Sequence, residues 1–115
     1  MEARFELEET SGGKFVFNLI AANQEIILTS QLYASKHGAE EGIASVARNA
    51  AFDERYEEKT GVDGKLYFLL HAANKLVIGR SQMYGSKEAM KKGIASVKRH
   101  APRAETVDAS IPVRA

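Results

Sequence analysis

The sequence predicts an α+β fold, in which a tandem duplication of a β3-α-β unit forms one antiparallel sheet with two helices on one face and exchanged terminal strands. Three observations predict this fold. The chain repeats itself at an offset of 51 residues, each copy carries short runs of alternating apolar residues, and each copy then changes to the apolar period of a helix. The length of 115 residues suits one compact domain.

The duplication gives 22 identities in 47 positions when residues 4–50 are aligned with residues 55–101. The longest shared block, Gly-Ile-Ala-Ser-Val, begins at Gly42 and again at Gly93. Such self-similarity indicates a duplicated structural unit. The predicted bounds are 1–115 for a single domain, about 4–54 for the first repeat and about 55–110 for the second.

Each repeat begins with strands. Alternating apolar residues at Phe15, Phe17 and Leu19 indicate one strand, and a second apolar run at residues 26–28 follows an Asn-containing turn. This pattern is typical of a β-hairpin, and the second repeat has its counterpart within residues 66–78.

A helix follows each hairpin. Ser35 and Ser86 stand where an N-cap is expected, and Pro102 ends the second helix. Each helix has an apolar stripe at positions i, i+4, i+7 and i+11, formed by Ala39, Ile43, Val46 and Ala50 in the first and by Met90, Ile94, Val97 and Ala101 in the second.

Three short segments at residues 4–6, 55–57 and 106–108 are related by the same offset. The middle segment closes the first repeat and opens the second, so the last segment has no further repeat to join. We expect it to pair back into the other half of the sheet, which makes the two repeats one cooperative domain.

The repeated motifs are a Gly-Lys strand start, an Ala-Ala-Asn turn, SxxYxSK and GIASVxR. Together they resemble the YegP-like family of small tandem-repeat bacterial proteins, over nearly the whole chain. The resemblance implies two β3-α-β units that share one sheet and exchange their terminal strands. It implies no activity, because the family is largely uncharacterised.

The chain departs from this family at the hairpin tip, where family members often have Asn-Gly. It has Asn23-Gln24 and Asn74-Lys75 instead. Because Gln and Lys resist positive φ, we do not expect a tight type I′ turn at these positions.

Composition excludes several classes of function. The absence of cysteine excludes disulfides, thiolate catalysis and Cys-ligated zinc, and it is compatible with a reducing cytosol. No apolar run approaches about 20 residues and no secretion signal is recognisable, so we expect a cytoplasmic protein without a membrane partner. His37, His71 and His100 show no paired spacing, and no phosphate-binding glycine motif is present, so neither a metal nor another cofactor is expected.

The most enzyme-like motif is SxxYxSK, in which a serine next to a lysine suggests a base-activated hydroxyl. We favour a structural interpretation, in which the serines cap helices, the lysines point outward and the tyrosines pack at the strand-to-helix corner. No catalytic residue is therefore predicted. The repeated surface candidates are Tyr33, Ser35 and Lys36 in the first copy and Tyr84, Ser86 and Lys87 in the second.

Two packing surfaces are also predicted. Gly42 and Gly93 lie in mid-helix, where glycine costs about 1 kcal/mol relative to alanine. We expect the two helices to touch through small-residue ridges at these glycines, and the alternative is close packing on the strands beneath. The opposite sheet face is unusually apolar and predicts a homodimer or a protein partner; it carries Val16, Ile20, Tyr67 and Leu69.

The two repeats differ most in charge. Residues 1–51 carry a net charge of −3 and residues 52–115 carry +4, and Glu40 and Glu41 of the first helix are replaced by lysines in the second. In the favoured interpretation the acidic and basic helices attract each other, with about 0.2–1 kcal/mol per exposed pair.

In the alternative interpretation the basic second helix binds nucleic acid or another polyanion weakly. The predicted patch consists of Lys91, Lys92, Lys98 and Arg99. The function that the sequence favours is a small, non-catalytic cytosolic module acting through surface interaction. An enzyme at the SxxYxSK motif ranks behind both.

Overall fold

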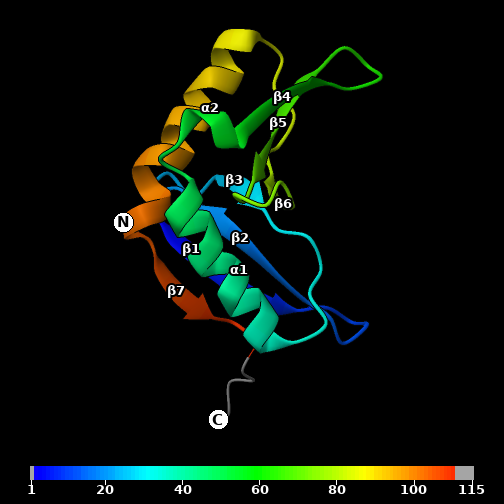
Figure 1. Cartoon of the computed structure of the whole chain (residues 1–115), viewed down its shortest axis with the longest axis vertical. Coiled ribbons are helices and arrows are strands. Elements are labelled where there is room, and N and C mark those ends of the chain that lie inside the picture. The colour runs from blue at the N-terminus through cyan, green and yellow to red at the C-terminus, as the bar shows by residue number, and fades with distance from the viewer. Residues whose placement is uncertain (1, 111–115) are drawn as a thin grey trace.

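The computed structural model describes residues 2–110 and shows, within them, a seven-stranded sheet with two helices (Figure 1). The residues at the ends of the predicted 1–115 domain, residue 1 and residues 111–115, lie outside the described part. The elements are β1 (Arg4–Glu9), β2 (Phe15–Ile20), β3 (Ile26–Thr29), α1 (Lys36–Asn49), the 3₁₀ turn η1 (Asp53–Arg55), β4 (Tyr56–Thr60), β5 (Leu66–His71), β6 (Val77–Arg80), α2 (Lys87–His100), the 3₁₀ turn η2 (Ala101–Arg103) and β7 (Glu105–Asp108).

The strand order is β4-β5-β6-β3-β2-β1-β7, so the two repeats meet where β3 pairs with β6. We call β1, β2, β3 and β7 the first half and β4, β5 and β6 the second half. Strand β4 leaves α1 and joins β5, whereas β7 leaves α2 and joins β1. The predicted α+β fold with exchanged terminal strands is therefore confirmed.

The sheet is mixed, because β7 pairs with β1 in parallel while the other described strand pairs are antiparallel. The expectation of a wholly antiparallel sheet fails at this one pair. The offset of 51 residues makes β7 a counterpart of β4, and it makes β2 the counterpart of β5. Because β4 pairs with β5 in antiparallel orientation, β7 would be expected to pair with β2 in the same way. Since β1 already pairs with β2, β7 adds outside β1 in the same direction, and two strands with the same direction pair in parallel.

One hydrophobic core lies between the sheet and the helices. Phe5 and Leu7 of β1 stand opposite Leu19 and Phe17 of β2, and opposite residues in a ladder point to the same face. Both helices bury their apolar stripes in this one cluster, so both cover the same sheet face, as the sequence predicts. The fully buried large side chains are Phe5, Leu7, Phe17, Leu19, Leu28, Val46, Phe68, Leu70, Met90 and Val97.

Serine caps begin both helices. The Gly38 N–H donates to the Ser35 hydroxyl oxygen at 3.0 Å, and the Ala89 N–H donates to that of Ser86 at 3.1 Å. Each bond satisfies a donor that the first helical turn leaves without a partner. The predicted N-caps are confirmed.

The mid-helix glycines make room for tyrosines. A Cβ on Gly42 would lie 2.6 Å from Cζ of Tyr33, and one on Gly93 would lie equally close to Cζ of Tyr84. Each tyrosine ring stacks on a core phenylalanine, with centroids 6.0 Å apart in the first repeat and 6.3 Å apart in the second. The predicted contact between helices through these glycines is wrong, because a ring anchored on the sheet occupies that space.

The hairpin tips are tight despite their sequence. The Gln24 N–H donates to the Ala21 carbonyl at 2.9 Å, and Lys75 makes the same bond to Ala72. Both Gln24 and Lys75 have a φ of 72°, in the left-handed region that glycine adopts most easily. Asn23 and Asn74 do not have positive φ, so the turns are not of type I′, as the sequence predicts. The premise that Gln and Lys resist positive φ is wrong at these positions, and each turn carries a local backbone cost.

Replacing Lys75 by glycine should relieve that cost. A non-glycine residue in the left-handed region costs roughly 1–2 kcal/mol, and glycine gives back part of this gain as chain entropy. We expect Lys75→Gly to raise the free energy of unfolding by about 0.5–1 kcal/mol in urea titrations. Asn74→Gly is the matched control and should lower it, because the Asn74 side chain accepts a hydrogen bond from the Leu76 N–H at 3.1 Å. Equal stability of Lys75→Gly and wild type would contradict the assignment.

Replacing Gly93 by alanine should destabilise the protein, although alanine is the better helix former. The added methyl group overlaps the Tyr84 ring, which is stacked on Phe68 and has little room to move. Overpacking of this kind costs typically about 1–3 kcal/mol. Gly85→Ala is the control, because no atom lies within 4 Å of its added Cβ. Thermal unfolding of both variants checks this, and a more stable Gly93→Ala would disprove the tight fit.

Candidate functional site: a groove beside strand β4

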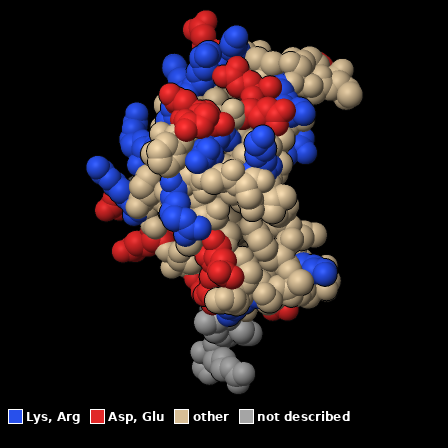
Figure 2. Space-filling view, in the orientation of Figure 1, with Lys and Arg blue, Asp and Glu red and all other residues tan. Residues whose placement is uncertain are grey.

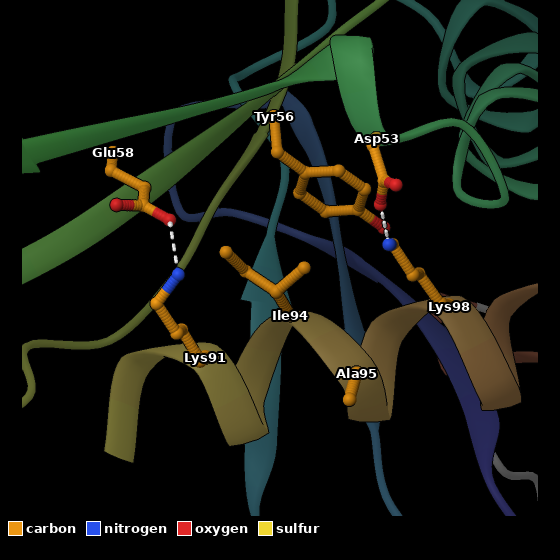
Figure 3. A pocket seen from close by; sticks show the side chains of 7 residues that line it. All are labelled: Asp53, Tyr56, Glu58, Lys91, Ile94, Ala95 and Lys98. Atoms are coloured by element: carbon orange, nitrogen blue, oxygen red, sulfur yellow. Dashed lines mark ion pairs between the residues drawn. The ribbon is translucent and has the colours of Figure 1, made fainter. Parts of the chain in front are cut away.

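The two halves differ most at their outer edges. The outer side of β1 pairs with β7, whereas the outer side of its counterpart β4 pairs with no described strand, so the described sheet ends at β4 and at β7. A groove of about 470 Å³ lies between β4 and α2 (Figure 3). We call it the β4–α2 groove; it is lined by Asp53, Tyr56, Glu58, Lys91, Ile94, Ala95 and Lys98.

The centre of the groove is apolar. The ring of Tyr56 packs edge-on against Phe68 with centroids 5.7 Å apart, and Ile94 lies half-buried beside it (Figure 3). The Tyr56 hydroxyl donates to the Ala50 carbonyl at 2.6 Å. Burial raises the pKa of Tyr56 well above its usual value of 10, so the phenol is neutral near pH 7. Tyr56 therefore offers an apolar surface and not an activated nucleophile.

Two ion pairs cross the groove, one from α2 to β4 and one from α2 to η1 (Figure 3). Lys91 Nζ lies 3.9 Å from a carboxylate oxygen of Glu58, and Lys98 pairs with Asp53. Lys98 Nζ also lies 5.7 Å from the centroid of the Tyr56 ring. Exposed pairs of this kind contribute only about 0–1 kcal/mol each, so a ligand can open them at little cost.

The predicted basic patch is divided. Lys91 and Lys98, two helical turns apart, face the groove, whereas Lys92 lines a different hollow beside Tyr84. Arg99 is exposed one residue beyond Lys98, which rotates it about 100° around the helix. Figure 2 shows acidic and basic side chains interspersed over the half of the molecule that holds α2 and β4.

The predicted attraction between the helices takes another form. Lys91 and Lys98 pair with carboxylates of β4 and η1, and not with the acidic residues of α1. Glu41 of α1 instead pairs with His37 of the same helix, at 3.3 Å. The lysines of α2 that face the groove therefore form ion pairs with β4 and η1, and not with the other helix.

The SxxYxSK motif has structural contacts in both copies. Burial raises the pKa of Tyr33 and of Tyr84, which opposes activation of either hydroxyl. Lys36 Nζ donates to the Asp108 carboxylate at 2.9 Å and so ties β7 to α1. Lys87, its counterpart, is exposed and lines a smaller hollow of about 210 Å³ that shares Glu58 with the β4–α2 groove. The serines are the helix caps described above.

The second sheet face is partly covered by its own side chains. Ile20 is buried, Val16 and Leu69 are half-buried, and the Arg80 guanidinium lies 4.6 Å from the centroid of the Tyr67 ring. A homodimer or a protein partner on this face stays a prediction. Within residues 2–110, no group of three or more His, Asp or Glu side chains is placed to hold a metal ion, and no helix is long and apolar enough to span a bilayer.

Sequence reasoning missed the groove, although the signal was present in the repeat alignment. Leu7, Glu40 and Ala47 of the first copy correspond to Glu58, Lys91 and Lys98 of the second. The three residues of the second copy all line the groove. Only the strand order shows that they lie together at an uncovered edge.

Comparisons with known proteins agree with this architecture. The sequence matches the family described as "Domain of unknown function (DUF1508)" twice, over residues 11–57 and 62–108. It is 54% identical over 98 residues to UPF0339 protein YegP of Escherichia coli strain K12, covering 85% of this chain and 89% of that protein. It is 46% identical over 110 residues to UPF0339 protein PA0329 of Pseudomonas aeruginosa, covering 96% of this chain and 100% of that protein.

Two solution NMR structures are similar throughout. The structure of yegP from E. coli, a protein of unknown function, has a TM-score of 0.91 at 48% identity and covers 98% of this chain and 97% of its own. That of UPF0339 protein SO3888 from Shewanella oneidensis has a TM-score of 0.90 at 42% identity, covering 96% and 93%. The resemblance inferred from the repeated motifs is confirmed.

The attachment of β7 should respond to pH through Asp108. Hydrogen bonds from Ser110, foremost, and from Lys36 lower the pKa of Asp108 from 3.8 to about 2. Because the folded pKa is depressed, this contribution to stability is present above about pH 4 and is lost as pH falls toward 2. Carboxyl-carbon NMR titration should show this pKa. Ser110→Ala should raise it more than Lys36→Met, and an unshifted value near 3.8 in the wild type would contradict the contact.

Proposed function

We propose that this chain, which belongs to the DUF1508 family of bacterial proteins, is a non-catalytic cytosolic module that acts by binding another protein in the β4–α2 groove. The relatives named above are described as proteins of unknown function or by family number alone, so the proposal is supported by the groove itself. The absence of cysteine from the sequence is compatible with a reducing compartment.

One observation carries the proposal: the second copy departs from the first where the sheet edge is open. The first half satisfies the same fold with Leu7, where the second has Glu58. Charged residues on a free edge protect it against aggregation, which accounts for Glu58 and its neighbour Lys59. Edge protection does not account for the accessible apolar floor of Tyr56 and Ile94 between two charged rims. A partly apolar hollow with a polar rim is typical of a protein interface.

Charge favours a protein over a polyanion. Each lysine that faces the groove already has a carboxylate partner, Glu58 for Lys91 and Asp53 for Lys98. A nucleic acid would have to displace both carboxylates and then lie beside them, which lowers the gain from counterion release. A polypeptide offers apolar groups for Tyr56 together with charges of both signs.

Site-specific photo-cross-linking in the bacterial host tests the proposal. Ala95 is exposed and lines the groove, and Ala44 is its exposed counterpart on α1. A photoreactive amino acid at position 95 should give a discrete adduct that protease digests, and the same group at position 44 should give none. The matched pair removes effects that arise from random collision.

Each other outcome has a defined meaning. An adduct that nuclease shortens would overturn the protein partner and favour the polyanion alternative. An adduct with a second copy of this chain would indicate a homodimer. The absence of any adduct at position 95, or equal adducts at both positions, would show that the groove is not a binding site.

A further inference from the structure

We infer that the β4–α2 groove receives an added β-strand: an extended acidic segment of a partner protein pairs with β4 in parallel, as β7 pairs with β1. The inference rests on the proposed function and specifies the mode of binding and the chemistry of the partner. It follows from comparing the outer side of β1, which we call the first edge, with the outer side of β4, which we call the second edge.

The first edge shows how an added strand is held. β7 lies parallel to β1 with Thr106 opposite Phe5 and Asp108 opposite Leu7. The Ala109 N–H donates to the Leu7 carbonyl at 2.8 Å. The Asp108 carboxylate accepts from Lys36 Nζ at 2.9 Å, at the start of α1. The strand is thus anchored by the backbone ladder on one side and by a helix lysine on the other.

The second edge repeats both anchors. β4 pairs with β5 in the register that β1 has with β2, so Glu58 stands opposite Phe68 as Leu7 stands opposite Phe17. The Glu58 carbonyl therefore takes the place of the Leu7 carbonyl, on the outer side of β4. Among the described strands none but β5 pairs with β4. Lys87 takes the place of Lys36 and is exposed.

Burial shows what the second edge lacks. Beneath β7, Phe5 and Leu7 are 1% and 0% exposed. At the second edge, Tyr56 is only half-buried and Glu58 is exposed. The β4–α2 groove and the smaller hollow at Lys87 share Glu58, so together they extend along β4 from Asp53 to Lys87. This is the course that β7 follows along β1, from η2 to Lys36.

The chemistry of the helix rim selects an acidic strand. A carboxylate placed as Asp108 is placed would meet Lys87, which makes no ion pair with another described residue. Strand addition takes its affinity from main-chain hydrogen bonds and its specificity from such alternate side chains.

A second copy of this chain is a poor candidate for the strand that pairs with β4. Among the described strands, the one that pairs in parallel with an equivalent strand is β7, and it already pairs with β1 and with Lys36 of its own chain. Donating β7 to another copy would expose Phe5 and Leu7 at the edge that it leaves. We therefore infer that the strand that pairs with the outer side of β4 comes from a different protein.

The test uses a synthetic peptide with the sequence of residues 103–110, Arg-Ala-Glu-Thr-Val-Asp-Ala-Ser, because this strand is known to fit the equivalent edge. The peptide is titrated into the full ¹⁵N-labelled chain. We expect amide shifts in β4 and in the first turns of α2, together with slower hydrogen exchange of β4 amides. A spin label at the peptide N-terminus should broaden signals near Asp53, and not those near Lys87, if the strand is parallel.

Charge variants test the lysine anchor. Lys87→Glu should weaken peptide binding by about tenfold or more, because it places like charges together. Replacing the aspartate of the peptide by lysine should restore binding to Lys87→Glu. Lys92→Glu is the matched control, since it removes the same charge from the same helix outside the groove, and it should change the affinity by less than about twofold.

The contrary results are distinguishable. Shifts confined to β1, broadening near Lys87, unchanged β4 exchange, or equal effects of Lys87→Glu and Lys92→Glu would each overturn strand addition. If the peptide fails to bind while the Ala95 cross-link to a protein persists, the groove binds its partner in another way. If both fail, the proposed function fails as well.

Discussion

The structure depends on one constraint: only one strand can pair with the outer side of β2. Strand β1 takes that position, so β7, which leaves α2 as β4 leaves α1, must add one place further out. The duplicated unit therefore closes into one sheet with a strand in excess at one end. Strand β1 therefore has an outer neighbour, whereas its counterpart β4 has none among the described strands, and this asymmetry follows from topology before any difference in side chains is considered.

The helices are fixed to this sheet by the same contacts in both repeats. Tyr33 and Tyr84 each make a backbone bridge to the strand beneath and stack on a core phenylalanine. A glycine in the helix above leaves room for the ring, so the helix lies closer than a side chain at that position would permit. The helical cost of glycine, about 1 kcal/mol, is thus offset by aromatic packing.

What the sequence predicts well is what depends on neighbouring residues. The helical stripes, the caps at Ser35 and Ser86 and the hairpins follow from local periods and local hydrogen bonds, and they are confirmed. Two features were predicted wrongly, each because another element of the fold decides it. The parallel β7 depends on β1, and the mid-helix glycines depend on tyrosines nine residues earlier. The left-handed conformation of Gln24 was not expected either, and the hairpin around it holds it.

The candidate site shows the same division between local and distant information. The change from Glu40 to Lys91 is legible in the repeat, and it correctly marks where the two halves differ. The pairing of Lys91 with Glu58 could not be predicted from the repeat, because only the strand exchange places β4 beside α2. The pairing of β7 with β1 shows that the outer side of this strand accepts a parallel strand with an acidic residue near the start of the helix. The outer side of β4 retains the carbonyl and the lysine that correspond to those holding β7 at β1, and no described strand pairs with it there. In physical terms, the outer side of β4 is equivalent to the outer side of β1 without the strand that pairs there.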